Sequence, residues 1–313
     1  MATTALLFPG QGSQYVGMGQ DLFQDHESAR GILERADATL GFGLTEVMFG
    51  SGDEAADNEA LKQTDNTQPA LYAHSMAVMA VLKDMGLPFD MTAGHSLGEY
   101  SALAAAGALS FEDGLLLVRE RGRLMAEAGQ KSPGTMAAII GMDDADVEAA
   151  CEAVDGVVQP ANFNSPGQVV ISGSEQAVAA AMEQATERGA RRVIPLPVSG
   201  AFHSPLMEHA RDGLAAALEG VSISVPSCPV YLNVNAQPET DPEAIRRRLL
   251  EQLMAPVRWS QTLNRMQKDG TQTFVEVGAG RVLSGLVKRT LGRDATTIAL
   301  GTSQDIASYT VES

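Results

Sequence analysis

Gly94-His95-Ser96-Leu97-Gly98 predicts a sharp turn from a strand into a helix, with a serine at its apex. The preceding residues 91–93 favour a strand, and residues 101–106 read Ser-Ala-Leu-Ala-Ala-Ala, a composition typical of a helix. Glycines on both sides of Ser96 permit a strained turn and let the strand pack closely against the helix. Ser96 is therefore a candidate nucleophile, and the alternative is an ordinary turn with a capping serine.

The composition indicates a folded globular protein. The 313 residues suffice to bury a large core, and 44% of them are hydrophobic against 19% charged. A net charge of −17 argues against nucleic-acid binding, and no apolar run approaches the length that spans a membrane. Residues 1–8 lack a basic leader, and Cys151 and Cys228 have neither disulfide-framework nor metal-ligand spacing. We therefore expect a cytoplasmic protein in which both cysteines are buried.

The order of predicted strands and helices indicates an α/β protein with two subdomains. The first third alternates β-prone and helical segments, including a helix at 71–85, as in a parallel sheet. Residues 135–196 differ, because their strands and helices follow the β-α-β-β-α-β order of the ferredoxin-like motif. We expect a large subdomain at 1–128 and 199–313 and a small inserted subdomain at 129–198.

A serine hydroxyl needs a general base, and the chain offers five histidines. His95 is adjacent to Ser96 and so points to the opposite face of an extended strand, which makes it a residue that lines the site instead. His203 lies in the loop Ser199-Gly200-Ala201-Phe202-His203-Ser204-Pro205, between a predicted strand and a predicted helix. Functional residues are common in such loops, so His203 is the candidate base; a surface histidine is the alternative.

An oxyanion hole requires hydrogen-bond donors opposite the base. The N–H of Leu97, directly after the candidate nucleophile, is the expected first donor. A second donor is expected from the turn Pro9-Gly10-Gln11-Gly12-Ser13-Gln14, which follows the first predicted strand. The spacing of its glycines matches neither a dinucleotide-binding loop nor a phosphate-binding loop.

These motifs together resemble the malonyl-CoA:acyl-carrier-protein transacylases, the acyltransferase family of fatty-acid and polyketide synthesis. The resemblance covers essentially the whole chain, in the same order and spacing. It includes Phe8-Pro9-Gly10-Gln11-Gly12-Ser13-Gln14, Gly94-His95-Ser96-Leu97-Gly98-Glu99-Tyr100, Arg121-Gly122-Arg123-Leu124-Met125, Asn162-Phe163-Asn164-Ser165-Pro166-Gly167-Gln168-Val169-Val170-Ile171-Ser172-Gly173, Gly200-Ala201-Phe202-His203-Ser204, Gln252-Leu253, Pro256-Val257-Arg258-Trp259 and Glu276-Val277-Gly278.

The resemblance implies a fold and a set of site residues. The fold is an α/β-hydrolase-like large subdomain with a ferredoxin-like insert. Ser96 takes the position of the acylated nucleophile and His203 that of its base. The other implied positions are Gln11 and Leu97 in the oxyanion hole, Arg121 on the substrate carboxylate, Gln252 with its carbonyl on the histidine, and His95, Asn164 and Phe202 as supporting residues.

Two of these positions bear on selectivity. A buried Arg121 guanidinium would make a bidentate pair with a free carboxylate, and an acetyl group would leave it unpaired. The alternative is a solvated helix face on which Arg119, Glu120, Arg121 and Arg123 form ion pairs. The ring of Phe202 would crowd a methyl branch on the acyl group, although simple packing is an alternative.

The implied reaction is a ping-pong transfer from malonyl-CoA through a malonyl-serine ester to an acyl carrier protein. No metal, nicotinamide or flavin is needed, because the partner carries the phosphopantetheine. Acidic carrier proteins would dock on local positive charge, for which Arg191, Arg192, Lys288 and Arg289 are candidates; solvated surface charge is the alternative.

Other functions stay open at this point. A discrete acyltransferase of a polyketide pathway would use the same residues with another carrier. A serine hydrolase or thioesterase would use the same turn, and a catalytically silent carrier-binding module would need neither Ser96 nor His203.

Overall fold

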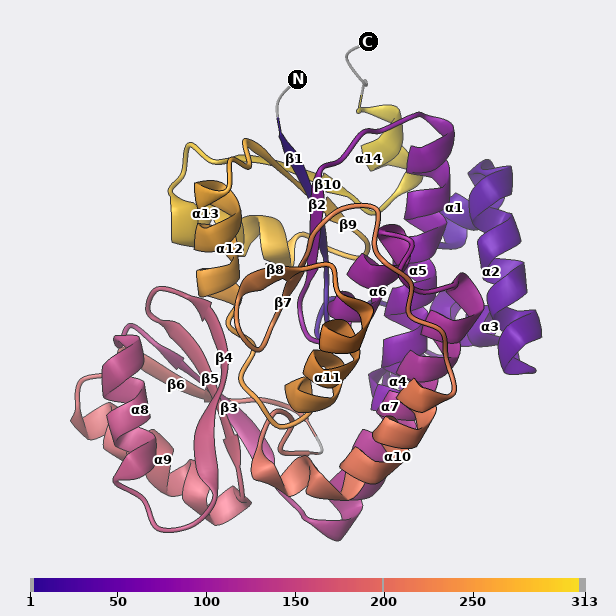
Figure 1. Ribbon diagram of the computed structural model, residues 1–313. Helices are drawn as coiled ribbons and strands as arrows, with labels where there is room; N and C mark the ends of the chain where they lie inside the picture. Colours follow the sequence, from indigo (N-terminus) through magenta and orange to yellow (C-terminus); the bar gives the residue numbers. More distant parts are fainter. Residues whose placement is uncertain (1–2, 199, 310–313) are drawn as a thin grey trace.

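The computed structural model describes residues 3–198 and 200–309, which form two β-sheets with helices packed around them (Figure 1). The larger sheet has the strand order β10-β9-β1-β2-β7-β8. Its strands are β1 (Thr4–Phe8), β2 (Met91–Gly94), β7 (Val230–Leu232), β8 (Gln237–Glu239), β9 (Thr273–Val277) and β10 (Thr296–Leu300). All neighbours pair in parallel except β7 and β8, which form an antiparallel edge.

Strand β1 shows why the larger sheet is buried on both faces. Ala5 and Leu7 pack with Trp259, Leu263 and Leu286 of helices α12 (Trp259–Lys268) and α13 (Val282–Leu291). The alternate residues Leu6 and Phe8 belong to the core cluster on the opposite face. Successive side chains of a strand point to opposite faces, so an unbroken apolar run suits a strand that is covered on both sides.

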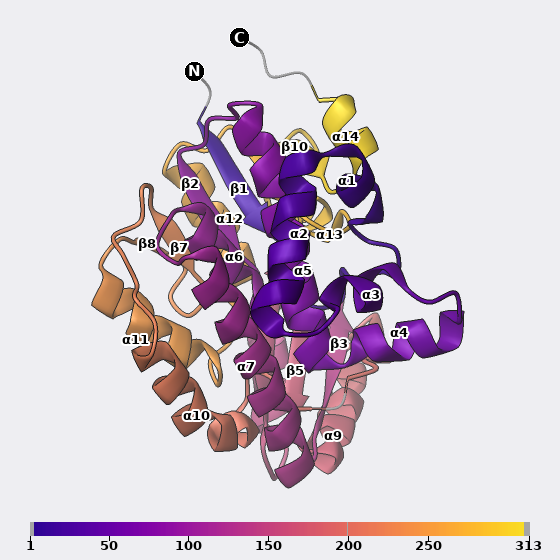
Figure 2. The same cartoon turned by 90° about the vertical axis from the view of Figure 1, so that its right-hand side faces the viewer.

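The opposite face carries the remaining helices of the larger layer. Helix α7 packs against α5 and α10 (Figure 2). The helices of the larger layer, besides α12 and α13, are α1 (Gln20–Asp25), α2 (Glu27–Leu40), α3 (Leu44–Phe49), α4 (Glu54–Lys62), α5 (Thr64–Asp84), α6 (Gly98–Ala105), α7 (Phe111–Lys131), α10 (Glu208–Glu219), α11 (Pro242–Gln252) and α14 (Ser303–Ala307), with a short 3₁₀ helix at Pro205–Met207.

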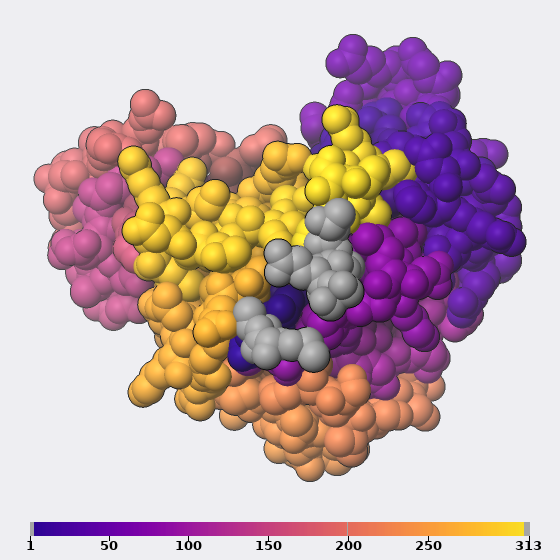
Figure 3. Space-filling model, turned by 90° about the horizontal axis from the view of Figure 1, so that it is seen from above, coloured from indigo at the N-terminus to yellow at the C-terminus, as the bar shows by residue number. Residues whose placement is uncertain are grey.

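The smaller sheet is antiparallel and has the strand order β4-β5-β3-β6. Its elements are β3 (Thr135–Ile140), α8 (Asp144–Glu152), β4 (Val158–Ser165), β5 (Gln168–Gly173), α9 (Glu175–Glu187) and β6 (Arg192–Pro195), which confirms the predicted β-α-β-β-α-β order. Ala137 and Ile139 face α8 and α9, whereas Met136 and Ala138 face the larger layer. Seen from the end where the termini lie, this layer projects beside the C-terminal segment (Figure 3).

Two features differ from expectation. Helix α5 begins at Thr64 instead of residue 71 and continues through Pro69, a residue that in the sequence signals a helix start. Cys151 is buried, but Cys228 is only half-buried. None of the helices in the described ranges is long and apolar enough to cross a bilayer.

Candidate active site

The turn that carries Ser96 confirms the predicted strand-turn-helix arrangement. Strand β2 ends at Gly94, helix α6 begins at Gly98, and Ser96 has a left-handed φ of 53°. A Cβ atom on Gly94 would lie 1.8 Å from the carbonyl oxygen of Gly98, and one on Gly98 would lie 2.2 Å from that of Phe8. Both glycines are therefore required by backbones that approach too closely for any side chain.

His203 reaches Ser96 from a loop more than 100 residues further along the chain. The Ser96 Oγ and His203 Nε2 atoms are 2.8 Å apart, and His203 Nδ1 lies 2.8 Å from the backbone oxygen of Gln252. A carbonyl can only accept, so Nδ1 carries the proton and Nε2 is left to accept from the serine hydroxyl. Burial and the charge of Arg121 lower the pKa of His203 to about 3, which keeps the imidazole neutral at pH 7.

Arg121 lies inside the molecule on α7, with 1% of its surface exposed. Its Nη1 donates to Gln68 Oε1 at 2.7 Å, and its Nη2 lies 3.0 Å from Gln252 Oε1 and 3.2 Å from Ser96 Oγ. The buried Nε atom has no hydrogen-bond partner within the part of the chain that the structure describes. The solvated-face interpretation is thus wrong for Arg121, whose guanidinium is buried beside Ser96.

One cavity of about 410 Å³ brings these groups together between the two sheets. Gln11, Leu97, Phe202, His95 and Asn164 all line it, together with Ser96, His203 and Arg121. His95 Nε2 and Asn164 Oδ1 are 2.8 Å apart, so the amide orients the imidazole. The predicted site residues therefore converge on one place, with Gln252 directly behind His203.

The predicted docking residues lie outside this cavity. Arg191, Arg192, Lys288 and Arg289 are all exposed. Arg289 Nη1 nevertheless lies 2.6 Å from the Oε1 atom of Gln168, a residue that lines the cavity. Of the four residues, Arg289 is thereby placed next to the cavity.

Sequence reasoning did not single out three buried polar residues around the turn: Gln68, Glu99 and Asn233. Glu99 and Asn233 are linked, since the Asn233 N–H donates to Glu99 Oε2 at 2.6 Å. Burial raises the pKa of Glu99 to about 7. Membership of the Gly94–Tyr100 motif could have indicated a role for Glu99. Asn233 only follows an apolar strand, and no neighbouring residue in the sequence marks it as part of the site.

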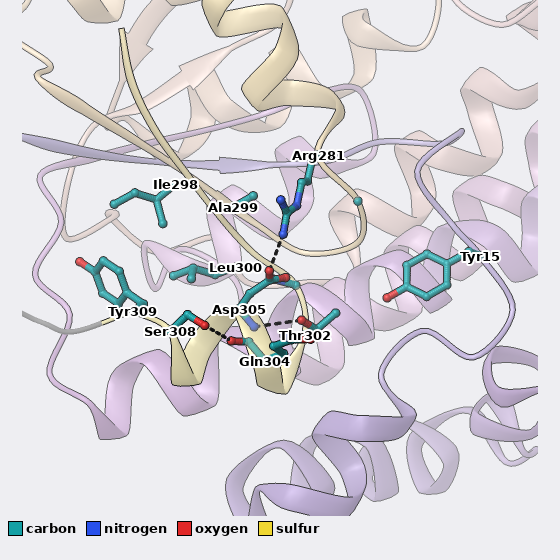
Figure 4. Close-up of a pocket in the computed structure, with 12 residues that line it drawn as sticks. Tyr15, Arg281, Ile298, Ala299, Leu300, Thr302, Gln304, Asp305, Ser308 and Tyr309 are labelled. Atoms are coloured by element: carbon teal, nitrogen blue, oxygen red, sulfur yellow. Dashed lines mark hydrogen bonds and ion pairs between the residues drawn. The ribbon is translucent and has the colours of Figure 1, made fainter. Parts of the chain in front are cut away.

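A second cavity, of about 610 Å³, lies at the end of β10 and contains none of the predicted site residues. Figure 4 shows Arg281 and Asp305 pointing toward each other across it, where Arg281 Nη2 and Asp305 Oδ1 are 2.6 Å apart. This pairing leaves the charges there mutually satisfied.

A strained serine bonded to a buried neutral histidine, on an α/β scaffold, is the arrangement of enzymes that use serine to transfer or hydrolyse acyl groups. Comparison with known proteins narrows this class. The acyl transferase domain family matches residues 5–311, and the chain belongs to that family.

Similar proteins match along the whole chain. The malonyl CoA-acyl carrier protein transacylase of Bacillus subtilis (strain 168) is 46% identical over 312 residues, covering 98% of this chain and 96% of that protein. The acyl-carrier-protein S-malonyltransferase structure from Bartonella henselae has a TM-score of 0.92 and 42% identity, and covers 97% of each chain. A malonyl-transacylase solved with a type II PKS acyl-carrier protein has a TM-score of 0.93 and 40% identity, and covers 98% of each chain.

Proposed function

We propose that this protein transfers the malonyl group of malonyl-CoA to the phosphopantetheine thiol of an acyl carrier protein and so supplies fatty-acid biosynthesis. The observation that carries the proposal is the buried Arg121 guanidinium, 3.2 Å from Ser96 Oγ in the shared cavity. A buried cation next to a nucleophile selects an acyl group with its own carboxylate. Relatives that bear the name malonyl CoA-acyl carrier protein transacylase at 42–46% identity support it.

In the first half-reaction, His203 Nε2 accepts the Ser96 proton while Oγ attacks the thioester carbonyl of malonyl-CoA. The C–S bond breaks, the coenzyme A sulfur takes the proton from His203, and a malonyl-serine ester remains. The Gln252 carbonyl, 2.8 Å from Nδ1, stabilises the transient imidazolium in place of an aspartate. Because that partner is neutral, the ion pair of a serine protease has no counterpart here.

In the second half-reaction, the carrier's thiol gives its proton to His203 and attacks the ester carbonyl. The C–O bond breaks, Ser96 recovers its proton from His203, and malonyl-carrier protein leaves. In both halves the oxyanion forms next to Gln11 and Leu97, whose backbone N–H groups we assign as its donors because both residues line the cavity beside Ser96.

Phe202 restricts the acyl group in this proposal. It lines the cavity directly before His203 and is 8% exposed, so its ring has little freedom to move. A methyl branch at the malonyl Cα would meet a packed aromatic ring, which favours malonyl over methylmalonyl.

The carrier protein docks, in this proposal, at the basic rim made by Arg191, Arg192, Lys288 and Arg289. Arg192 of β6 and Gln168 of β5 lie opposite the same residue of β3, and Arg289 of α13 contacts Gln168. This register and this contact support placing both basic pairs on the side of the molecule where Gln168 lines the cavity. An acidic partner placed there would present its thiol to Ser96 while its charges are paired at the surface.

A carrier from a polyketide pathway is the second candidate. It is favoured by the similar structure in which a malonyl-transacylase is bound to a type II PKS acyl-carrier protein. The chemistry at Ser96 is the same, so only the carrier distinguishes the two.

Two further assignments stay proposals. We assign residues 129–198 to the small subdomain and residues 1–128 and 199–313 to the large one, since the antiparallel sheet lies wholly within 129–198. We place the protein in the cytoplasm, in line with Cys151 and Cys228, which are both free thiols.

The test is the intact mass of the enzyme after mixing with equimolar malonyl-, methylmalonyl- and acetyl-CoA, with Ser96→Ala beside it. We expect one malonyl adduct on the wild type and none on the variant. Release of coenzyme A without an adduct would identify a hydrolase, and neither adduct nor release would contradict the proposed chemistry. Transfer to fatty-acid and polyketide carriers in turn then decides between the two candidate partners.

A further inference from the structure

Asn233 connects the two ends of the strained turn through one side-chain amide. Its Oδ1 accepts from the backbone N–H of Ser96 at 2.7 Å, and its Nδ2 donates to the carbonyl oxygen of Gly94 at 2.7 Å. Asn233 follows β7, the strand beside β2, and is completely buried. The amide therefore satisfies one polar group on each side of the His95 residue that precedes the serine.

Asn233 is itself held by neighbouring residues. Its backbone N–H donates to Glu99 Oε2 at 2.6 Å, and its backbone oxygen accepts from the Arg258 N–H at 3.0 Å. Gln252 contacts both residues, because its Nε2 donates to the Ser96 carbonyl oxygen at 3.0 Å and to Asn233 Oδ1 at 3.5 Å. Both polar groups of the Ser96 backbone are thus bound by side chains from elsewhere in the chain.

Ser96 needs such restraint because its φ of 53° is unfavourable for any residue with a Cβ atom. Strained conformations at functional sites persist only where the surroundings over-determine them. The close contacts of Gly94 and Gly98 allow the turn but place no donor or acceptor on Ser96. Without the Asn233 amide, the peptide can rotate and carry Oγ away from the His203 Nε2 atom 2.8 Å from it.

We infer that Asn233 is a positioning residue for the reaction: its amide holds Ser96 in the conformation that aligns Oγ with His203. It is absent from the residues that line the cavity, so it acts on the nucleophile through the backbone and does not touch the acyl group. The inference rests on the proposed role of Ser96 as the nucleophile.

The first experiment measures the intrinsic reactivity of Ser96 with diisopropyl fluorophosphate, which phosphorylates activated serines and needs neither Arg121 nor a carrier. A misplacement of about 1 Å typically lowers a reaction rate by about 100-fold. We expect Asn233→Ala to lower the phosphorylation rate constant by about that factor. The kcat for malonyl transfer should fall equally, while the KM for malonyl-CoA stays within about twofold, because Arg121 and the cavity wall are unchanged.

Two variants separate positioning from stability. Thr45→Val removes the 2.5 Å hydrogen bond from Thr45 Oγ1 on α3 to Asp37 Oδ2 on α2, outside the cavity. It should lower the melting temperature without changing the phosphorylation rate. Asn233→Ser keeps a polar group that is too short to reach Ser96 and Gly94 together, and it should lose rate as Asn233→Ala does. It serves as the test if the alanine variant does not fold.

The outcomes are distinguishable. If wild-type enzyme is not phosphorylated at Ser96, the proposed function fails. If wild type reacts and a folded Asn233 variant reacts at the same rate, the positioning role is wrong. A rate loss equal to that of Thr45→Val, or a KM that rises with kcat unchanged, would likewise overturn it.

Discussion

Replacing Arg121 with alanine should convert the enzyme from one that prefers malonyl groups into one that does not. On the Nε–Nη2 edge of the guanidinium, Nη2 lies 3.2 Å from Ser96 Oγ and Nε has no hydrogen-bond partner among the described residues. A malonyl carboxylate on that edge accepts two charge-assisted hydrogen bonds, each of about 1.5–3 kcal/mol. An acetyl group accepts neither.

The two bonds together correspond to about 3–6 kcal/mol, or about 10²- to 10⁴-fold in kcat/KM. The lower end is the better guide, because Nη2 already holds the Gln252 and Ser96 oxygens and must share its hydrogens with the substrate. We expect kcat/KM for malonyl-CoA to fall at least about 100-fold and kcat/KM for acetyl-CoA to stay within about threefold. Arg121→Lys keeps the charge without the planar edge, so its loss should be intermediate.

The assay is coenzyme A release with each thioester, followed by transfer to carrier protein. Arg123→Ala is the matched control, since Arg123 lies two residues on in the same helix and forms exposed ion pairs with Glu120 and Glu127. It should change neither rate. Equal losses with malonyl-CoA and acetyl-CoA in Arg121→Ala would refute the reasoning, because Arg121 would then support the site's structure and not bind the carboxylate.

Four more outcomes are expected. Phe202→Ala should raise methylmalonyl transfer relative to malonyl transfer by about tenfold, measured by competition; an unchanged ratio would exclude the ring as the barrier. Replacing Arg191 and Arg192 with glutamate should raise the KM for carrier protein about tenfold at low salt and leave the KM for malonyl-CoA unchanged. If neither constant changes, the carrier protein docks on another surface. Because the pKa of His203 is lowered to about 3, kcat/KM should stay flat from pH 8 to 5, where an unperturbed histidine would cost about 30-fold; an acid limb near pH 6.5 would contradict this. Burial lowers the pKa of His74 to about 4, below its unfolded value, so the stability that neutral His74 contributes is present above pH 6.5 and is lost as pH falls. Between pH 7 and pH 5 the unfolding free energy of His74→Leu, measured by urea titration, should therefore fall by about 2 kcal/mol less than that of the wild type.

The sequence predicted the turn because the residues that mark it are close together in the chain. Gly94 and Gly98 are four residues apart, and the backbone contacts that demand glycine involve each other and the adjacent strand. The β-α-β-β-α-β order was predicted for the same reason, since each helix and strand shows its own spacing of hydrophobic residues and is bounded by its own turn residues. The start of α5 was predicted too late in the chain, because the helix continues through Pro69, where packing against α7 outweighs the local preference of proline.

The sequence by itself therefore determined where the strand-turn-helix lies and, through the family's motifs, which side chains belong to the site. Only the tertiary structure decided that Arg121 is buried and that Asn233 holds Ser96. Arg121 meets Gln68 and Gln252 across 53 and 131 residues of sequence, and Asn233 meets Ser96 across 137. Charged and amide side chains carry no periodic signal of burial, because their partners come from helices and strands that only the packed fold brings together.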